Sequence, residues 1–180
     1  MVLTTLRGGK VTNEFYLTGQ IKKTTGVRTY PVEYTYDYAG RMQTMKTWTN
    51  YPSGSPAVTT WAYDPNRGWL AGKFYADATT GAAQTSSGTT YTYTDAGRLH
   101  TRTWARTVGG QPLVTTYAYN GAGDMETVDY SDTTPDVTYG YDRRGRQTSM
   151  AQAGGTTTTR VFNLENAVLL TQRERRTQRG

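Results

Sequence analysis

The chain has no cysteine and only one histidine, His100. Without thiols it can form neither a disulfide framework nor a thiolate metal site. A lone histidine in a strand-like segment is an ordinary surface residue, and nothing in the sequence places an activated serine near it. We therefore expect no catalytic residue, no bound metal and no cofactor.

Long hydrophobic stretches are also missing. The longest aliphatic run is 167–170, and the first ten residues, MVLTTLRGGK, lack the apolar segment of a signal peptide. The sequence therefore predicts neither a signal peptide nor a membrane span. Leucine occurs nine times in 180 residues, against 36 threonines, 15 tyrosines and 20 glycines. Threonine and tyrosine suit half-buried strands and glycine suits turns, so the composition favours an all-β protein.

The formal net charge of +6 is concentrated at one end of the chain. Residues 173–180 hold four arginines and one glutamate, which leaves 16 basic and 13 acidic side chains in residues 1–172. This distribution predicts a single domain over 1–172 and a solvated basic tail over 173–180. It argues against nucleic acid as a partner and leaves acidic glycans as a weaker alternative.

One short pattern recurs along the chain: Tyr-x-Tyr-Asp-x-x-Gly-Arg followed by an apolar residue. The copies YTYDYAGRM at 34–42 and YTYTDAGRL at 91–99 are nearly identical, and two worn copies lie at 15–21 and 162–168. The second aromatic residue of each of the seven copies follows the previous one after 21 to 30 residues. The clear copies supply the candidate motif residues Tyr34, Tyr36, Asp37, Gly40, Arg41, Tyr63, Asp64, Gly68, Tyr91, Tyr93, Gly97, Arg98, Tyr117, Tyr119, Gly123, Tyr139, Tyr141, Asp142, Gly145 and Arg146.

Each copy predicts a β-hairpin. Alternation of aromatic and β-branched residues at 90–93 places Tyr91 and Tyr93 on one face of a strand. An aspartate at the strand end favours an Asx-turn, and the glycine favours a left-handed conformation that reverses the chain. Trp104 lies seven residues after its motif glycine, whereas Trp48 lies eight after its own, so we expect a β-bulge in one of the two strands.

A lone hairpin is marginal in water, so consecutive hairpins are expected to pair edge to edge. The prediction is an array of tandem antiparallel hairpins, about seven repeats and roughly 14 strands, in one sheet. Because strands twist, a sheet of this width should be curved or spiralling, with one concave face rich in aromatic residues. Its open edges would pair with flanking repeats or with identical subunits, giving a homo-oligomer or a filament.

The tandem YxYDxxGR(L) motif resembles that of the YD-repeat, or RHS-repeat, family over about residues 10–170. That family includes bacterial polymorphic toxins, shell components of insecticidal toxin complexes, and animal teneurins. The resemblance implies hairpins that wind into a hollow shell around a toxic polypeptide or around the chain's own end. It also implies a secreted or cell-surface bacterial protein, although no signal peptide is visible in this chain.

The sequence departs from the family pattern in two respects. Seven hairpins are too few for a closed container, and the family's core-ending segment with its DPxGL-type self-cleavage site is missing. The segment YDPNRGWL at 63–70 echoes that site, but a further hairpin follows it, so it is interpreted as an ordinary turn. Neither encapsulation nor self-cleavage is therefore carried over to this chain.

Three function classes remain to be weighed. The leading hypothesis is a non-enzymatic structural β-repeat module, part of an RHS-type toxin shell or of an extracellular or surface self-assembly. The alternative is a carbohydrate- or protein-binding adhesion module that uses an aromatic concave face, with Trp48, Trp61, Trp69 and Trp104 as candidate ligand-binding residues. A hydrolase is the weakest hypothesis, because each motif aspartate sits at its own turn, where an Asx-turn role suffices.

Overall fold

The computed structural model describes residues 2–6, 9–165 and 168–175, and these form an all-β fold. The described residues form fifteen strands. They contain no helix, and therefore no helix long and apolar enough to cross a membrane. The strands are β1 (Val2–Leu6), β2 (Gly9–Phe15), β3 (Ile21–Gly26), β4 (Thr29–Tyr36), β5 (Met42–Thr47), β6 (Ala57–Tyr63), β7 (Leu70–Phe74), β8 (Gly88–Tyr93), β9 (Leu99–Val108), β10 (Gln111–Tyr119), β11 (Met125–Tyr130), β12 (Val137–Tyr141), β13 (Gln147–Gln152), β14 (Thr156–Phe162) and β15 (Val168–Arg175).

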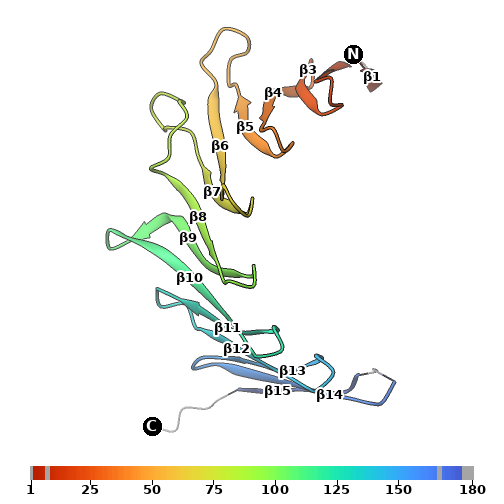
Figure 1. Cartoon of the computed structure of the whole chain (residues 1–180), viewed down its shortest axis with the longest axis vertical. Helices are drawn as coiled ribbons and strands as arrows, with labels where there is room; N and C mark the ends of the chain where they lie inside the picture. Colours follow the sequence, from red (N-terminus) through yellow and green to blue (C-terminus); the bar gives the residue numbers. More distant parts are fainter. Residues whose placement is uncertain (1, 7–8, 166–167, 176–180) are drawn as a thin grey trace. The chain divides into compact units, whose positions relative to one another are not determined.

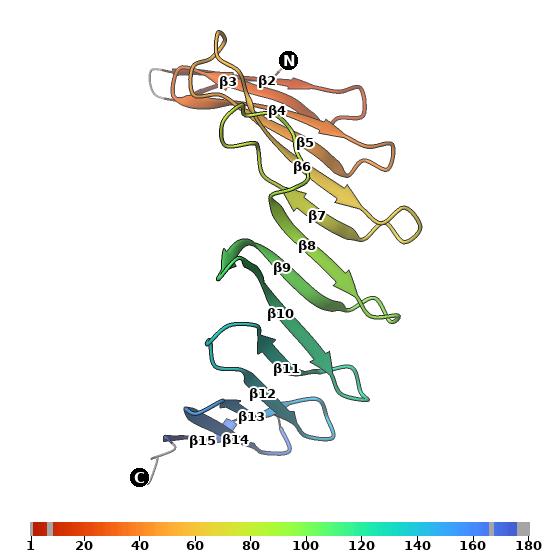
Figure 2. The same cartoon turned by 90° about the vertical axis from the view of Figure 1, so that its left-hand side faces the viewer.

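The strands pair in chain order, each antiparallel to its neighbours in sequence, within one sheet. The chain divides into two compact units, residues 1–90 and 91–180, and the division falls inside β8. Within each unit the motif turns lie at one end of the strands and the connectors lie at the other end (Figures 1 and 2). Antiparallel pairing in chain order requires this arrangement, since every second connection lies at the same end of the strands.

All seven predicted hairpins are present, with the motif at the turns β2–β3, β4–β5, β6–β7, β8–β9, β10–β11, β12–β13 and β14–β15. The sequence pattern did not reveal β1, which pairs with β2 over five residue pairs. At the other end β15 runs to Arg175, the third residue of the expected basic tail, and residues 176–180 lie outside the described residues.

A β-bulge lies at the same place in six of the hairpins. In β4–β5, Thr35 pairs with Thr44 but Tyr36 pairs with Met42, so Gln43 is the extra residue. The same register shift precedes the second aromatic residue in β2–β3, β6–β7, β10–β11, β12–β13 and β14–β15. The bulge expected near one of the two tryptophans is also found: the β9–β10 ladder shifts register opposite 104–106.

The motif turns share one backbone pattern. The amide of Asp37 donates to the carbonyl of Arg41, and the amide of Gly40 donates to the carbonyl of Asp37, both at 2.9 Å. An unpredicted turn of similar form lies in the β7–β8 connector, where Asp77 bonds Ala82 at 2.9 Å. Its signal in the sequence is the spacing Tyr75-x-Asp77, followed by a glycine four residues later.

The hydrophobic core is thin. Among the described residues only Leu113 and Val128 are buried apolar side chains, at 8% and 7% exposure, and the buried polar side chains are Thr89 and Thr115. Successive side chains of a strand point to opposite faces. We call the face that carries Tyr36, Tyr63, Tyr119 and Tyr141 the tyrosine face, and the other one the opposite face. With few fully buried side chains, contacts between neighbouring hairpins must supply much of the stability.

Candidate functional site

In four hairpins the second tyrosine of the motif connects its own hairpin to the one before it. Its hydroxyl donates a hydrogen bond to the backbone carbonyl of the apolar residue that closes the preceding motif. The pairs are Tyr36 to Ile21 at 3.0 Å, and Tyr63 to Met42, Tyr119 to Leu99 and Tyr141 to Met125, each at 2.8 Å. Burial raises the pKa of the Tyr36, Tyr63 and Tyr141 hydroxyls, which keeps them protonated as donors. We call this bond the tyrosine latch.

The motif arginine makes a second connection, toward the hairpin that follows. Arg41 holds one oxygen of Asp37 through Nε and Nη2, both at 2.7 Å, and its Nη1 donates to the carbonyl of Gly68 at 2.9 Å. Arg146 repeats this geometry on Asp142 at 2.6 Å and reaches the carbonyl of Asn163 at 2.9 Å. The guanidinium thus joins its own turn to the next one.

The same arginines cover the second aromatic ring of the following repeat. The guanidinium carbon of Arg41 lies 4.3 Å from the ring centre of Tyr63, and Arg146 lies 4.7 Å from that of Phe162. Arg98 lies 5.6 Å from the ring of Tyr119. These distances are in the range of cation–π attraction. In the first, worn repeat Gln20 replaces the arginine, and its amide still donates to Gly40 of the next turn at 2.8 Å.

The turn aspartates serve their own turns. Oδ1 of Asp37 accepts from the amides of Ala39 and Arg41, each at 2.9 Å. Burial acts to raise the pKa of Asp37, but the hydrogen bonds from the backbone and side chain of Arg41 outweigh it and lower the pKa. At Asp142 the hydrogen bond from the Arg146 side chain is the main cause of the lowered pKa.

The remaining motif residues have local roles. Asp64 accepts from the amides of Asn66 and Arg67, and Gly97 and Gly145 hold their turns at positive φ. The first-position tyrosines Tyr34, Tyr91, Tyr117 and Tyr139 are half-buried, as is Tyr93. The carbonyl of Tyr34 accepts a bond from the hydroxyl of Tyr16 at 3.0 Å.

Acidic groups and the histidine do not converge. Across the described part of the chain, no three or more Asp, Glu or His side chains gather as a metal site would require. His100 is exposed, with Nδ1 3.4 Å from the carbonyl of Tyr117.

Three of the four tryptophans have a cation over the ring. Lys73 lies 5.5 Å from the ring of Trp61, and Arg67 lies 4.8 Å from that of Trp69. Trp104 has Arg102 at 3.5 Å over its ring, and its indole donates to Thr115 at 3.0 Å. Trp48 differs: its ring meets the edge of Tyr51, with centres 5.5 Å apart and planes at 78°.

A hollow of about 490 Å³ lies beside Trp48, between the β3–β4 turn and the β5–β6 connector. Trp48, Tyr51 and Tyr30 line it, with 26–31 forming one wall. Tyr30 is 84% exposed and Tyr51 is 41% exposed, so the hollow opens to solvent between aromatic side chains.

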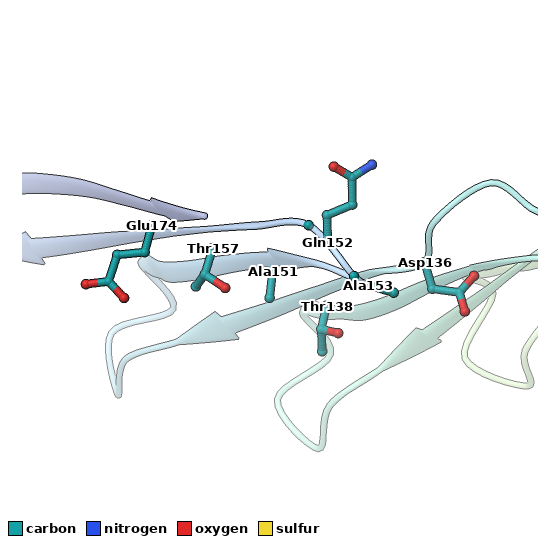
Figure 3. A pocket seen from close by; sticks show the side chains of 9 residues that line it. Asp136, Thr138, Ala151, Gln152, Ala153, Thr157 and Glu174 are labelled. Carbon is teal, nitrogen blue, oxygen red and sulfur yellow. The ribbon is translucent and has the colours of Figure 1, made fainter. Parts of the chain in front are cut away.

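A second hollow, of about 410 Å³, lies on the opposite face of the last four strands (Figure 3). Its floor crosses directly paired residues: Thr138, Ala151, Thr157 and Glu174. The side chains of the first three are short, which accounts for the depression. Asp136 lies at its rim, and Figure 3 shows no cluster of ligating groups around it.

Fold and contacts together define an array of tandem β-hairpin repeats joined by nearest-neighbour bonds. Solved structures share this fold. The chain superposes on the crystal structure of TcdB2-TccC3-TEV with a TM-score of 0.73 and 14% identity, covering 93% of this chain and 9% of that one. For TcdB2-TccC3-Cdc42 the TM-score is 0.74 with 15% identity, over 95% of this chain and 9% of that one.

A Photorhabdus luminescens Tc holotoxin pore carrying a mutated TccC3 gives a TM-score of 0.72 and 15% identity, over 92% of this chain and 9% of that one. The chain therefore shares its fold with part of the TcdB2-TccC3 toxin shell, a cocoon of RHS/YD repeats. It spans about 9% of the length of these structures. No family model matches the chain, and no curated protein matches it by sequence.

Proposed function

We propose that this chain is a non-enzymatic wall segment of an RHS-type toxin shell, exported or displayed at a bacterial surface. The observation that carries the proposal is the tyrosine latch, which couples neighbouring hairpins at four places in the described residues. Such bonds make a repeat stable only beside another repeat, which is the requirement for a continuous wall.

Two further observations support a structural role. The motif arginines Arg41 and Arg146 donate hydrogen bonds to carbonyls of the next turn. The turn aspartates accept hydrogen bonds from backbone amides of their own turn. The shared fold with the TcdB2-TccC3 shell, in which neighbouring repeats form a cocoon, gives the wall a physical analogy.

A chimera tests the proposal. The hairpins of the TcdB2-TccC3 shell that superpose on this chain are replaced by residues 9–175, and assembly is followed by electron microscopy and by protection of the enclosed polypeptide from protease. We expect a closed, protected particle. A matched chimera carrying Tyr36→Phe, Tyr63→Phe, Tyr119→Phe and Tyr141→Phe should assemble poorly. A folded chimera that leaves its contents open to protease contradicts the proposal.

Self-assembly of the chain by itself is the other form of the structural role. Three consecutive aliphatic side chains of β15, Val168, Leu169 and Leu170, are 52%, 64% and 53% exposed. An exposed apolar edge strand favours pairing with another strand. Light scattering and electron microscopy of the purified chain would show rings or filaments if copies join at these edges, and a monodisperse monomer if they do not.

A second candidate function, binding of a carbohydrate or a protein by aromatic side chains, is favoured at one place. The hollow beside Trp48 gathers three aromatic rings, whereas Trp61, Trp69 and Trp104 each have a cation over the ring. Glycan-array and peptide-array binding, with Trp48→Ala compared against Trp104→Ala, distinguishes a binding surface from a purely structural cluster.

A further inference from the structure

We propose that the hollow beside Trp48 binds a proline-rich polypeptide segment in the polyproline II conformation. This inference deepens the second candidate function by naming its ligand class, and it does not depend on the wall-segment role.

Aromatic side chains line the hollow. Polyproline II segments are recognised in grooves lined by tyrosine and tryptophan, because proline rings pack against aromatic faces with little loss of entropy. Trp48 and Tyr51 form one wall in edge-on contact, and Tyr30 stands at the rim. At 490 Å³ the hollow falls within the roughly 300–1,000 Å³ typical of ligand sites.

The polar side chains that line the hollow can all donate hydrogen bonds. Its polar side chains are Arg28, Thr29, Tyr30, Trp48, Thr49 and Tyr51. Each of these can donate a hydrogen bond, and the lining contains no Asp, Glu, Asn or Gln side chain. A proline-rich chain in this conformation offers carbonyl acceptors and few N–H donors, since proline has none. Donor-rich walls therefore match it.

Charged side chains hold the wall that carries Tyr51. Glu33 pairs with Lys23 at 3.8 Å and with Lys46 at 3.3 Å. Lys23 in turn lies 5.2 Å from the ring centre of Tyr51, which fixes this wall of the hollow.

The test uses the full chain and a fluorescein-labelled decaproline peptide, with a labelled Gly-Ser decamer of equal length as the control probe. Fluorescence anisotropy should show binding of decaproline and none of the Gly-Ser peptide. Tyr30→Ala should weaken binding by roughly tenfold, since an exposed aromatic anchor is removed without disturbing the fold. Trp48→Phe should weaken it too, because the indole donor is lost.

Tyr38→Ala is the matched control, because Tyr38 is 97% exposed in a motif turn outside the hollow. It should leave the affinity unchanged. The inference is overturned if decaproline does not bind at millimolar concentration, if the Gly-Ser peptide binds equally, or if Tyr38→Ala has the same effect as Tyr30→Ala. Binding of cellohexaose that depends on Tyr30, without binding of decaproline, would also overturn it while leaving a binding module in place.

Discussion

The two units use the same contacts on the tyrosine face but differ on the opposite face. In residues 1–90 that face carries Glu14, Lys23, Glu33 and Lys46 as directly paired neighbours across β2 to β5. In residues 91–180 the corresponding rows hold mostly short side chains, such as Thr138, Ala151 and Thr157. The latch and the arginine contacts occur in both units.

The comparison shows which residues the repeat requires. Contacts between hairpins lie at the turn and on the tyrosine face, where the motif is nearly constant. The opposite face accepts ion pairs in one unit and small hydroxyl or methyl side chains in the other, because cross-strand pairs of either kind stabilise a sheet by similar amounts. Effects of substitution should therefore be equal in the two units for motif residues and unequal for the opposite face.

The largest effect is expected at the turn glycines. Gly68 and Gly123 have positive φ, 71° and 89°, and a Cβ on either would strike the arginine of the preceding repeat. Replacement by alanine should cost about 2–3 kcal/mol, from the left-handed backbone and the displaced guanidinium. Gly19 has φ of 84° but open space around it, so Gly19→Ala should cost only about 1–2 kcal/mol. Urea denaturation measures the loss of stability for all three substitutions. Equal losses would show that the contact with the arginine adds no cost.

Removing one latch should have the next largest effect. Tyr63→Phe in the first unit and Tyr119→Phe in the second each delete one hydrogen bond of 2.8 Å to a carbonyl of the preceding hairpin. Each should lower the free energy of unfolding by about 1 kcal/mol. Tyr38→Phe, at an exposed position, should change nothing. Hydrogen exchange should accelerate at the seam of the altered latch alone; a change spread over the whole chain would argue against nearest-neighbour coupling.

Acid should weaken both units alike through their turn aspartates. The folded-state pKa of Asp37 and of Asp142 is lowered below the unfolded value near 3.8. Their contribution to stability is therefore fully present above that value and is lost as pH falls through the lower folded pKa. The expected loss is smaller than that of a latch, because both carboxylates lie at solvent-facing turns. NMR titration of the carboxyl carbons, with Asp37→Asn and Asp142→Asn as references, checks the direction of each shift.

The smallest effect should separate the two units. Glu33→Gln removes the partner of Lys23 and Lys46 and should cost about 0.5 kcal/mol at low salt, falling toward zero in 1 M NaCl. Glu126→Gln, an exposed position in β11 of the second unit, serves as the control and should show no salt dependence. Equal salt sensitivity of the two variants would mean that the charged row contributes nothing specific.

Hairpins and turns could be predicted from the sequence because they are local. Alternation at 90–93 and the Asp-to-Gly spacing at 37–40 fix strand and turn without reference to distant residues. The edge strand β1 carries no motif, and its pairing depends on β2, so periodicity gave no sign of it. The turn at 77–81 was missed because its aspartate stands two residues after a single tyrosine and lacks the flanking aromatic pair.

The contacts between repeats could not be predicted from the sequence. The pattern placed the aromatic residues on one face of the sheet but did not predict what their hydroxyls contact. Between motif turns, the rings of Tyr16 and Tyr36 meet with centres 6.0 Å apart. The hydroxyl-to-carbonyl bonds depend on the bulge, which sets the register of each second tyrosine against the strand before it. This bulge recurs in six of the hairpins, so a comparison of the copies with one another does not reveal it. The roles of the four tryptophans as ligand-binding residues remain predictions.

Because every latch has its donor in one repeat and its acceptor in the adjoining one, an added repeat brings both halves of a new junction with it. Duplication of a whole motif, together with one connector, would lengthen the protein without redesigning any existing contact. Loss of part of a motif would instead leave a tyrosine hydroxyl or a backbone carbonyl without its partner in the neighbouring repeat. Growth by complete copies is thus the favoured evolutionary route for such a chain.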